Sequence, residues 1–291
     1  MTLPAFRFGT VGAPKSTSKK PGGSAGAIIH LRSMALDAFE LGWVRSVRVS
    51  ENTCSAIKAA SDEHNVALSI HAPYFINLNA DDEEWPKSRK RLMDAAYYGY
   101  LAGATDIIFH PGSYFGKPPE EVLPIAIPRL QGCIDDLRKV HNPVTLRPET
   151  MGKAAMLGSL EDTLKMSQAI DGVEPCLDLP HLYARTGDES LNTYDEWIHT
   201  LEHYESILGT EALKRLHIHL SGIEYGPKGE RKHLPLEESD LDLDAILQAL
   251  RKFECGGRIV CESPILEEDA TLIKNKWQNL TKTGSNSEDE H

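Results

Sequence analysis

Apolar residues recur along the chain in short runs rich in β-branched side chains, and a stretch with helical spacing of apolar positions follows most of them. Such runs predict strands at residues 6–11, 44–49, 67–71, 106–110, 145–149, 175–178, 216–220 and 258–262. The stretch that begins at Ser88 shows the helical pattern: Ser88 is a candidate N-cap, and apolar side chains fall on one face as far as Gly103.

This alternation predicts an α/β fold in which helices cover a parallel sheet. Eight strand–helix units in 291 residues fit a closed (β/α)8 TIM barrel, a single domain over residues 1–280. A doubly wound open sheet is the alternative, but the chain has no glycine-rich dinucleotide motif after the first strand and no P-loop motif. Residues 281–291 are polar and acidic, which predicts a flexible tail.

Composition narrows the class of protein. Hydrophobic residues make up 41% of the chain and charged residues 25%, as in soluble globular proteins. The net charge of −12 argues against broad, nonspecific coating of nucleic acid. The five cysteines include no C-x2-C pair, which predicts reduced thiols rather than disulfides or a zinc ribbon. No run is apolar enough for a signal peptide or a membrane span, and no long heptad pattern occurs, so we expect a cytoplasmic monomer without membrane contact.

Six consecutive predicted strands end in an imidazole or a carboxylate. These residues are His71, His110, Glu149, Asp178, His219 and Glu262. The C-terminal strand ends of a barrel converge on one mouth, where catalytic groups lie. Three carboxylates there would repel one another unless cations neutralise them, and mixed His, Asp and Glu ligands suit zinc or manganese. The sequence therefore predicts a metal site in which a shared carboxylate can bridge two ions.

Further imidazoles lie beside this set. His181 follows the aspartate of the sixth strand by three residues, so it must lie where the chain has already turned, and the proline between them favours that turn. The glycine-rich segment 221–234 predicts a long polar loop that offers Glu230 and His233 as partners for His181 around a further ion. His217 is predicted one layer deeper in the seventh strand, which favours a packing or supporting role.

Short strings along the chain form a specific combination. They are HAPYFINL from His71, FHPGS from Phe109, RPETMG from Arg147, CLDLPH from Cys176, HLSG from His219 and CESP from Cys261. Together they resemble the endonuclease IV family of apurinic/apyrimidinic endonucleases, and the resemblance extends from the third predicted strand to the eighth.

The resemblance implies a barrel that holds three zinc ions, or two, and that cuts DNA 5′ to an abasic site in base-excision repair. Its partner would be damaged DNA, and its products a 3′-hydroxyl and a 5′-deoxyribose phosphate. The ligand sets it implies are His71, His110 and Glu149; Glu149, Asp178, His219 and Glu262; and His181, Glu230 and His233. It also implies catalytic roles for Glu149 and Glu262, and positions near the lesion for Tyr74 and Asn77.

Two features depart from the family's pattern. The last ligand pair is spaced acid-x-x-His at Glu230 and His233, where the family usually has acid-x-His. We expect a bulge after Gly229 to absorb the extra residue and Lys232 to point outward. The loop predicted after the second strand, residues 50–53, is also short.

Basic residues gather in segments that we predict to lie at the mouth, where they offer contacts to phosphates. They are Lys15, Lys19, Lys20, Lys87, Arg89, Lys90, Arg91, Lys228, Arg231 and Lys232.

The strand ends also allow a second enzyme class. A sugar isomerase or epimerase on this barrel would use Glu149, Asp178, His219 and Glu262 around one manganese or similar ion, but it would have no need of His71 and His110. A third interpretation is a catalytically silent nucleic-acid-binding module, which the complete ligand set disfavours.

Overall fold

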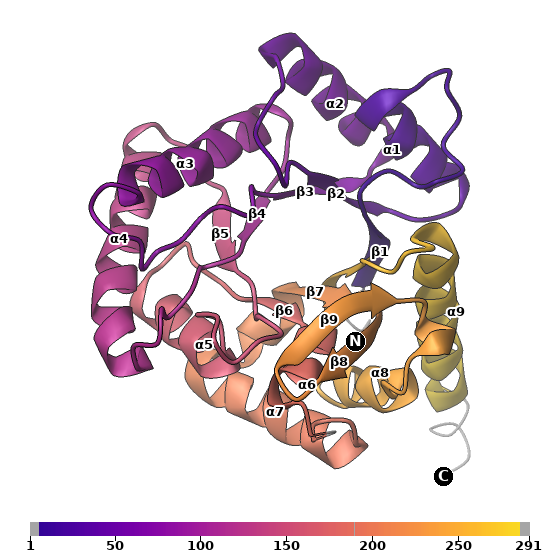
Figure 1. The fold of residues 1–291 in the computed structure, drawn as a ribbon. Helices are drawn as coiled ribbons and strands as arrows, with labels where there is room; N and C mark the ends of the chain where they lie inside the picture. The colour runs from indigo at the N-terminus through magenta and orange to yellow at the C-terminus, as the bar shows by residue number, and fades with distance from the viewer. Residues whose placement is uncertain (1–5, 189, 286–291) are drawn as a thin grey trace.

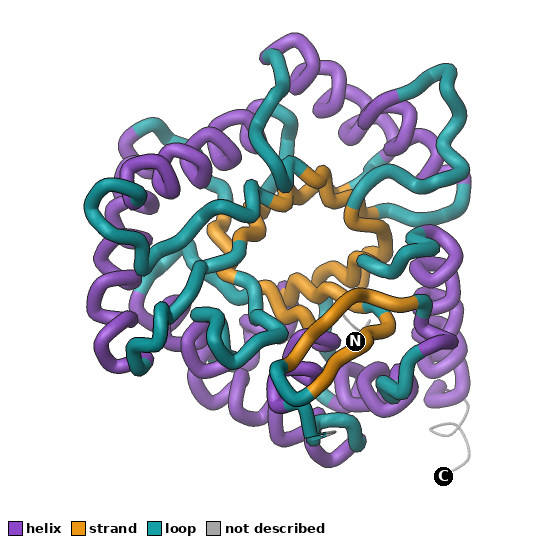
Figure 2. The backbone as a smooth tube through the Cα atoms, viewed as in Figure 1, coloured by secondary structure: helices purple, strands orange, loops and turns teal. Residues whose placement is uncertain are grey.

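The computed structural model describes residues 6–188 and 190–285. Within these residues, eight parallel strands form a nearly closed barrel that helices surround (Figure 1, Figure 2). The predicted TIM barrel is therefore confirmed. Its strands are β1 (Phe6–Val11), β2 (Ala38–Gly42), β3 (Ala67–His71), β4 (Asp106–Phe109), β5 (Thr145–Pro148), β6 (Cys176–Asp178), β7 (Leu216–Leu220) and β10 (Gly257–Cys261).

Helices follow the strands along the chain, and a hairpin is inserted after β7. The helices are α1 (Gly23–Ser33), α2 (Glu51–His64), α3 (Trp85–Leu101), α4 (Pro119–Lys139), α5 (Leu160–Ala169), α6 (Leu179–Thr186), α7 (Tyr194–Leu208), α8 (Leu243–Lys252) and α9 (Glu267–Ser285), with short 3-10 turns at Thr210–Arg215 and Leu236–Glu238. The hairpin consists of β8 (Gly222–Gly226) and β9 (Gly229–Leu234). Among the described helices, none is both long enough and apolar enough to span a membrane.

The barrel closes between β5 and β6. The sheet runs in the order β5-β4-β3-β2-β1-β10-β7-β6. The amide of Leu146 donates to the carbonyl of Gly172 at 3.0 Å, and the amide of Thr150 donates to the carbonyl of Cys176 at 3.0 Å. The first bond joins β5 to the segment before β6, and the second joins the segment after β5 to β6. Because all eight strands run parallel, their C-terminal ends form one mouth.

The second strand lies at Ala38–Gly42, so the prediction of a strand at 44–49 is wrong. The string VRSVRV alternates apolar and polar residues, which is typical of a half-buried strand, whereas a barrel strand is covered on both faces. Residues 38–41 are buried throughout, while Arg45 and Arg48 are exposed in the following loop. That loop spans residues 43–50 and is longer than predicted.

Other boundaries also differ from those predicted. Helix α3 begins at Trp85, and Ser88 lies buried inside it rather than at its N-cap. Segment 221–234 forms the β8–β9 hairpin instead of an irregular loop. Helix α9 includes residues 281–285 of the predicted tail, and residues 286–291 lie outside the described part of the chain.

Candidate metal centre

The barrel mouth contains a cavity of about 400 Å³. Nearly all of its lining side chains are imidazoles, carboxylates or a tyrosine. The lining residues are Val11, His71, Tyr74, His110, Glu149, Met151, His181, Glu230, His233 and Glu262. The structure thus brings together most of the residues that the sequence placed at the mouth, although they come from six different strands or their loops.

Glu149 lies between two groups of ligand atoms. Its Oε2 is 3.1 Å from Nε2 of His71 and 3.4 Å from Nε2 of His110. Its Oε1 is 3.7 Å from Nδ1 of His219. The two oxygens of one buried carboxylate therefore face different imidazole groups, which is the arrangement that a bridging ligand needs.

The second group surrounds His219. Its Nδ1 lies 3.5 Å from Oε1 of Glu262 and 3.9 Å from Oδ2 of Asp178, in addition to its approach to Glu149. Asp178 is the N-cap of α6, and its Oδ1 accepts a hydrogen bond from the amide of His181 at 2.7 Å. Because capping uses only one oxygen, the other remains directed at the cluster.

The same cap places His181 beside the cluster, as the expected turn after β6 requires. The Nδ1 of His181 donates to the carbonyl of Thr150 at 2.9 Å, which leaves Nε2 free and 3.4 Å from Oε2 of Glu230. The ring centroids of His181 and His233 are 5.3 Å apart. Nε2 of His233 also lies 3.4 Å from Oε2 of Glu262, so this third group adjoins the second.

A bulge in the hairpin brings the two β9 residues of this group to one face. Glu224 pairs with Lys232 and Tyr225 with Glu230, so Arg231 is the extra residue. A regular strand would send positions three apart to opposite faces, and one bulged residue cancels that difference. The expectation of a bulge is therefore confirmed, and Lys232 points outward and pairs with Glu224 at 3.2 Å.

Close backbone contact holds the hairpin against the loop that follows β5. The amide of Glu230 donates to the carbonyl of Gly152 at 2.8 Å. A Cβ at Gly152 would lie 2.6 Å from Cβ of Glu230 and 3.0 Å from Cδ2 of His181, so only glycine fits without displacement. The ETMG string thus supplies one candidate ligand, Glu149, and the space for two more, Glu230 and His181.

The carboxylates of the cluster raise the pKa values of two neighbouring imidazoles. Burial lowers the pKa of His71, but the hydrogen bond and charge of Glu149 outweigh it and raise that pKa to about 9. Burial likewise lowers the pKa of His181, but Asp178 and Glu149 raise it to about 10. Burial raises the pKa of Asp178 well above its usual range, and the charges of Glu262 and Glu149 add to this effect. Cations in place of these protons would satisfy the same electrostatic need.

The donor atoms fit divalent ions. Among the described residues, Oδ2 of Asp178, Nε2 of His181 and Nδ1 of His219 are buried and have no hydrogen-bond partner, although buried polar atoms are nearly always paired. Two atoms that bind one tetrahedral ion at ~2.0–2.2 Å lie roughly 3.3–3.6 Å apart. The distances of 3.1 to 3.9 Å between the facing nitrogen and oxygen atoms of the cluster span that range.

The two residues predicted near a substrate differ in placement. Tyr74 is half exposed, lines the cavity and lies with its ring centroid 5.1 Å from that of His110. Asn77 lies outside the cavity lining, and its Oδ1 accepts a hydrogen bond from the amide of Asn79 at 2.8 Å. Its placement supports a role in shaping the loop after β3 and gives no support to a substrate contact.

Sequence reasoning missed Glu40, a fully buried carboxylate on β2. Its Oε2 accepts hydrogen bonds from Ser69 and from Nε2 of His217, each at 2.8 Å. Because the second strand was predicted at residues 44–49, Glu40 was not recognised as part of a barrel strand. The available signal was a single acid within the otherwise apolar segment AFELG, residues 38–42.

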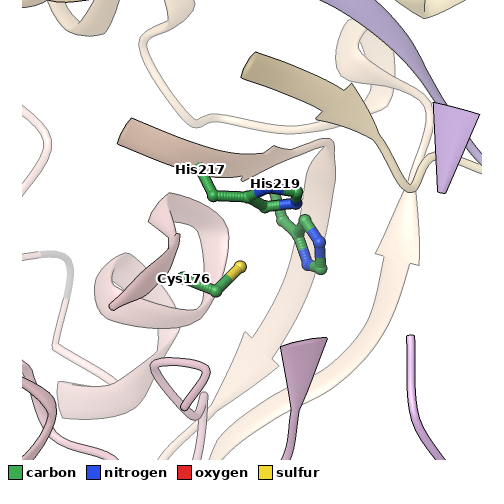
Figure 3. Close-up of side chains that lie close together, drawn as sticks. All are labelled: Cys176, His217 and His219. Atoms are coloured by element: carbon green, nitrogen blue, oxygen red, sulfur yellow. The ribbon is translucent and has the colours of Figure 1, made fainter. Parts of the chain in front are cut away.

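A deeper trio lies below the mouth. Figure 3 shows Cys176, His217 and His219 close together, with their donor atoms within 4.8 Å of one another. Burial raises the pKa of the Cys176 thiol, which therefore stays protonated, although zinc binds the thiolate. Burial also lowers the pKa of His217 to about 4, so this imidazole is neutral. The supporting role expected of His217 agrees with its hydrogen bond to Glu40.

Many of the basic residues predicted to contact phosphates pair with acids instead. On α3, Lys87 and Arg91 pair with Glu84, Arg89 with Asp136 and Lys90 with Asp94, and on β9 Arg231 and Lys232 pair with Glu224. The loop between β2 and α2, which follows a strand end at the mouth, instead presents the exposed Arg45 and Arg48. The misplaced second strand had hidden these two cations as well.

Strand order and ligand cluster together define a TIM barrel with a candidate metal centre at its mouth. Residues 29–281 match the model of the xylose isomerase-like TIM barrel family, and the chain belongs to that family.

Two relatives place the chain further. An uncharacterized protein of Methanocaldococcus jannaschii is 38% identical over 274 residues, which cover 94% of this chain and 97% of the relative. A protein of Thermus thermophilus named endonuclease 4 is 28% identical over 206 residues, which cover 67% of this chain and 71% of that protein. The resemblance to the endonuclease IV family is thereby confirmed.

Solved structures show the same architecture. Endonuclease IV from Thermus thermophilus has a TM-score of 0.71 at 22% identity and covers 95% of this chain and 99% of its own. A D-tagatose 3-epimerase-like protein has a TM-score of 0.70 at 17% identity and covers 97% of this chain and 99% of its own. At these identities the likeness shows the fold alone, and a fold does not decide between the two activities.

Proposed function

We propose that this protein is a zinc-dependent phosphodiesterase that cleaves DNA 5′ to abasic sites. The relative named endonuclease 4 supports the reaction class. The observation that carries the proposal is the position of Glu149, whose two oxygens face separate imidazole groups at 3.1 and 3.7 Å. A one-ion site would need only the group around His219 and would leave His71 and His110 unexplained.

Three groups of residues would hold the ions. They are His71, His110 and Glu149; Glu149, Asp178, His219 and Glu262; and His181, Glu230 and His233, with manganese as the alternative to zinc. Divalent ions at such sites supply a nucleophile at neutral pH and neutralise charge on a phosphodiester.

The side chains of the chain have separate tasks in this reaction. Oxygen from water forms a bond to phosphorus, the bond from phosphorus to the 3′ oxygen breaks, and the products are a 3′-hydroxyl and a 5′-deoxyribose phosphate. Glu149 orients the attacking water. Glu262, whose side chain is 14% exposed at the cavity, accepts the proton that this water loses. The proton that completes the 3′-hydroxyl comes from solvent.

Binding of damaged DNA would rely on stacking and on local positive charge. Tyr74 offers a half-exposed ring at the cavity edge, where an abasic nucleotide can enter because it has no base to unstack. Arg45 and Arg48 offer cations on an adjacent loop, which a chain of net charge −12 needs near its mouth.

Incision of a duplex that carries one abasic site, with an intact duplex of the same sequence as control, tests the proposal. We expect cleavage of the damaged duplex only, loss of cleavage after chelation, and recovery when zinc is restored. Equal cleavage of both duplexes, or no cleavage by the zinc-loaded protein, would contradict it.

A second candidate function is a single-metal sugar isomerase or epimerase. The presence of a complete one-ion set around His219 favours it, and the fold, which the D-tagatose 3-epimerase-like structure shares, is compatible with it. The number of ions separates the two proposals. One ion per chain together with conversion of a ketose would favour the isomerase, whereas two or three ions would favour the phosphodiesterase.

A further inference from the structure

Glu40 connects opposite sides of the barrel interior. It lies on β2, whereas its imidazole partners lie on β7, and strands β1 and β10 separate these two in the sheet. The carboxylate is fully buried, as are both imidazoles. An acid in such a place is costly unless donors surround it, so its partners define its role.

Each oxygen of Glu40 has a separate set of partners. Oε2 accepts hydrogen bonds from Nε2 of His217 and from the hydroxyl of Ser69. Oε1 lies 3.0 Å from Nε2 of His219. The geometry of that contact does not meet the criteria for a hydrogen bond. Within the described part of the chain, neither Oε1 of Glu40 nor Nε2 of His219 has another hydrogen-bond partner. They are nevertheless a donor and an acceptor within reach, and a small rotation of the ring joins them.

The position of the proton on His219 follows from these contacts. A carboxylate that accepts from two donors at one oxygen acts as an acceptor at the other as well. The Nε2 atom that faces it must therefore carry a proton. In the neutral ring that a metal ion requires, the lone pair of His219 is then left at Nδ1, the atom that faces Glu149, Asp178 and Glu262.

We propose that Glu40 is a positioning residue that fixes the tautomer and the ring orientation of His219, so that Nδ1 serves as the metal ligand. His217 and Ser69 hold the carboxylate in place from the other side. Carboxylates that receive the second N–H of a ligand histidine orient it and strengthen it as a donor, and their loss typically lowers metal affinity ~10–100-fold. This inference rests on the proposed metal centre but not on the proposed DNA substrate.

The first test reads the proton on His219 directly in the full-length parent protein. Long-range proton–nitrogen NMR spectra of 15N-histidine-labelled protein are recorded with and without zinc. We expect Nε2 of His219 to carry a proton in both states, and zinc to shift the Nδ1 signal. A His219 without a proton on Nε2 in either state would overturn the inference. Failure to bind any zinc would instead contradict the proposed metal centre, while the proton on Nε2 would still report on Glu40.

The second test measures zinc affinity by competition with a chromophoric chelator. In Glu40→Gln the side chain keeps its size but offers only one accepting oxygen to donors on two sides. We expect one ion to bind 10–100-fold more weakly, with the same number of ions at saturation. Affinities within twofold of the parent would overturn the inference, and so would the loss of a whole ion, because Glu40 would then be a ligand itself.

Asp106→Asn is the matched control. Asp106 is equally deep in the barrel wall but pairs with Arg258 at 2.9 Å and with Arg147, away from the mouth. Circular dichroism checks that both variants fold. We expect the control to lose stability with unchanged zinc affinity, and an equal loss of affinity in both variants would overturn the inference. If Glu40→Gln does not fold, the NMR measurement on the parent protein decides.

Discussion

Glu149→Gln removes one negative charge from the position between two candidate ion sites and keeps the size of the side chain. The carboxylate oxygens lie 3.1 Å from His71, 3.4 Å from His110 and 3.7 Å from His219. An amide keeps a single oxygen, so one of the two ligand sets loses a member. We expect turnover to fall at least ~1000-fold, which corresponds to ~4 kcal/mol of transition-state stabilisation.

The variant should still fold. Burial lowers the pKa of His71, while Glu149 raises it to about 9, so the imidazolium depends on the carboxylate. When residue 149 is neutral, His71 can release its proton, and no charge remains buried without a partner.

The assay is steady-state incision of a duplex with one abasic site, together with zinc content and a circular dichroism spectrum. Glu174→Gln is the control, because Glu174 is a partly buried acid that pairs with Arg147 and Arg215 away from the mouth. We expect the control to keep its activity. Turnover of Glu149→Gln within tenfold of the parent, at equal zinc content, would refute a bridging role.

Three further predictions follow from the geometry. Tyr74→Ala should weaken binding to abasic DNA by ~1–3 kcal/mol without a change in zinc content, because the ring is half exposed beside the cavity; an unchanged Kd at matched salt would contradict this. Gly152→Ala should push the β8–β9 hairpin outward and cost the protein one bound ion, since the new Cβ would meet Glu230 at 2.6 Å; anomalous scattering at the zinc edge counts the ions, and an unchanged count would refute the argument. Burial raises the pKa of Asp106, but the charges of Arg147 and Arg258 outweigh this and hold it well below its usual range, so its contribution to stability is present above pH ~4 and is lost as the pH falls further. Asp106→Asn should therefore lower the free energy of unfolding by ~3–5 kcal/mol at neutral pH and by less in acid, and denaturant titrations that show a pH-independent difference would contradict this.

The strand ends could be predicted because they depend on local pattern and on a general property of barrels. His71 and Asp178 end β3 and β6, and His110, Glu149 and Glu262 directly follow β4, β5 and β10. Parallel strands deliver such ends to one mouth. Glu40 could not be predicted in this way. Its contact with His217 joins residues 177 positions apart across the interior, and no local period reports such a pairing. The second strand was misplaced for a related reason, since alternation in VRSVRV imitates a half-buried strand, while burial on both faces selects residues 38–41.

The bulge at Arg231 also bears on how relatives of this chain are recognised. It lets an acid and an imidazole three positions apart occupy one face of β9, so the sequence spacing of this pair can change by one residue while its direction in space stays the same. A search pattern that demands a fixed acid-x-His interval would reject this chain although both side chains border the cavity. An alignment of such barrels must therefore allow a gap in the hairpin. Residues of β9 are then matched by their pairing partners on β8, and not by the number of residues between them.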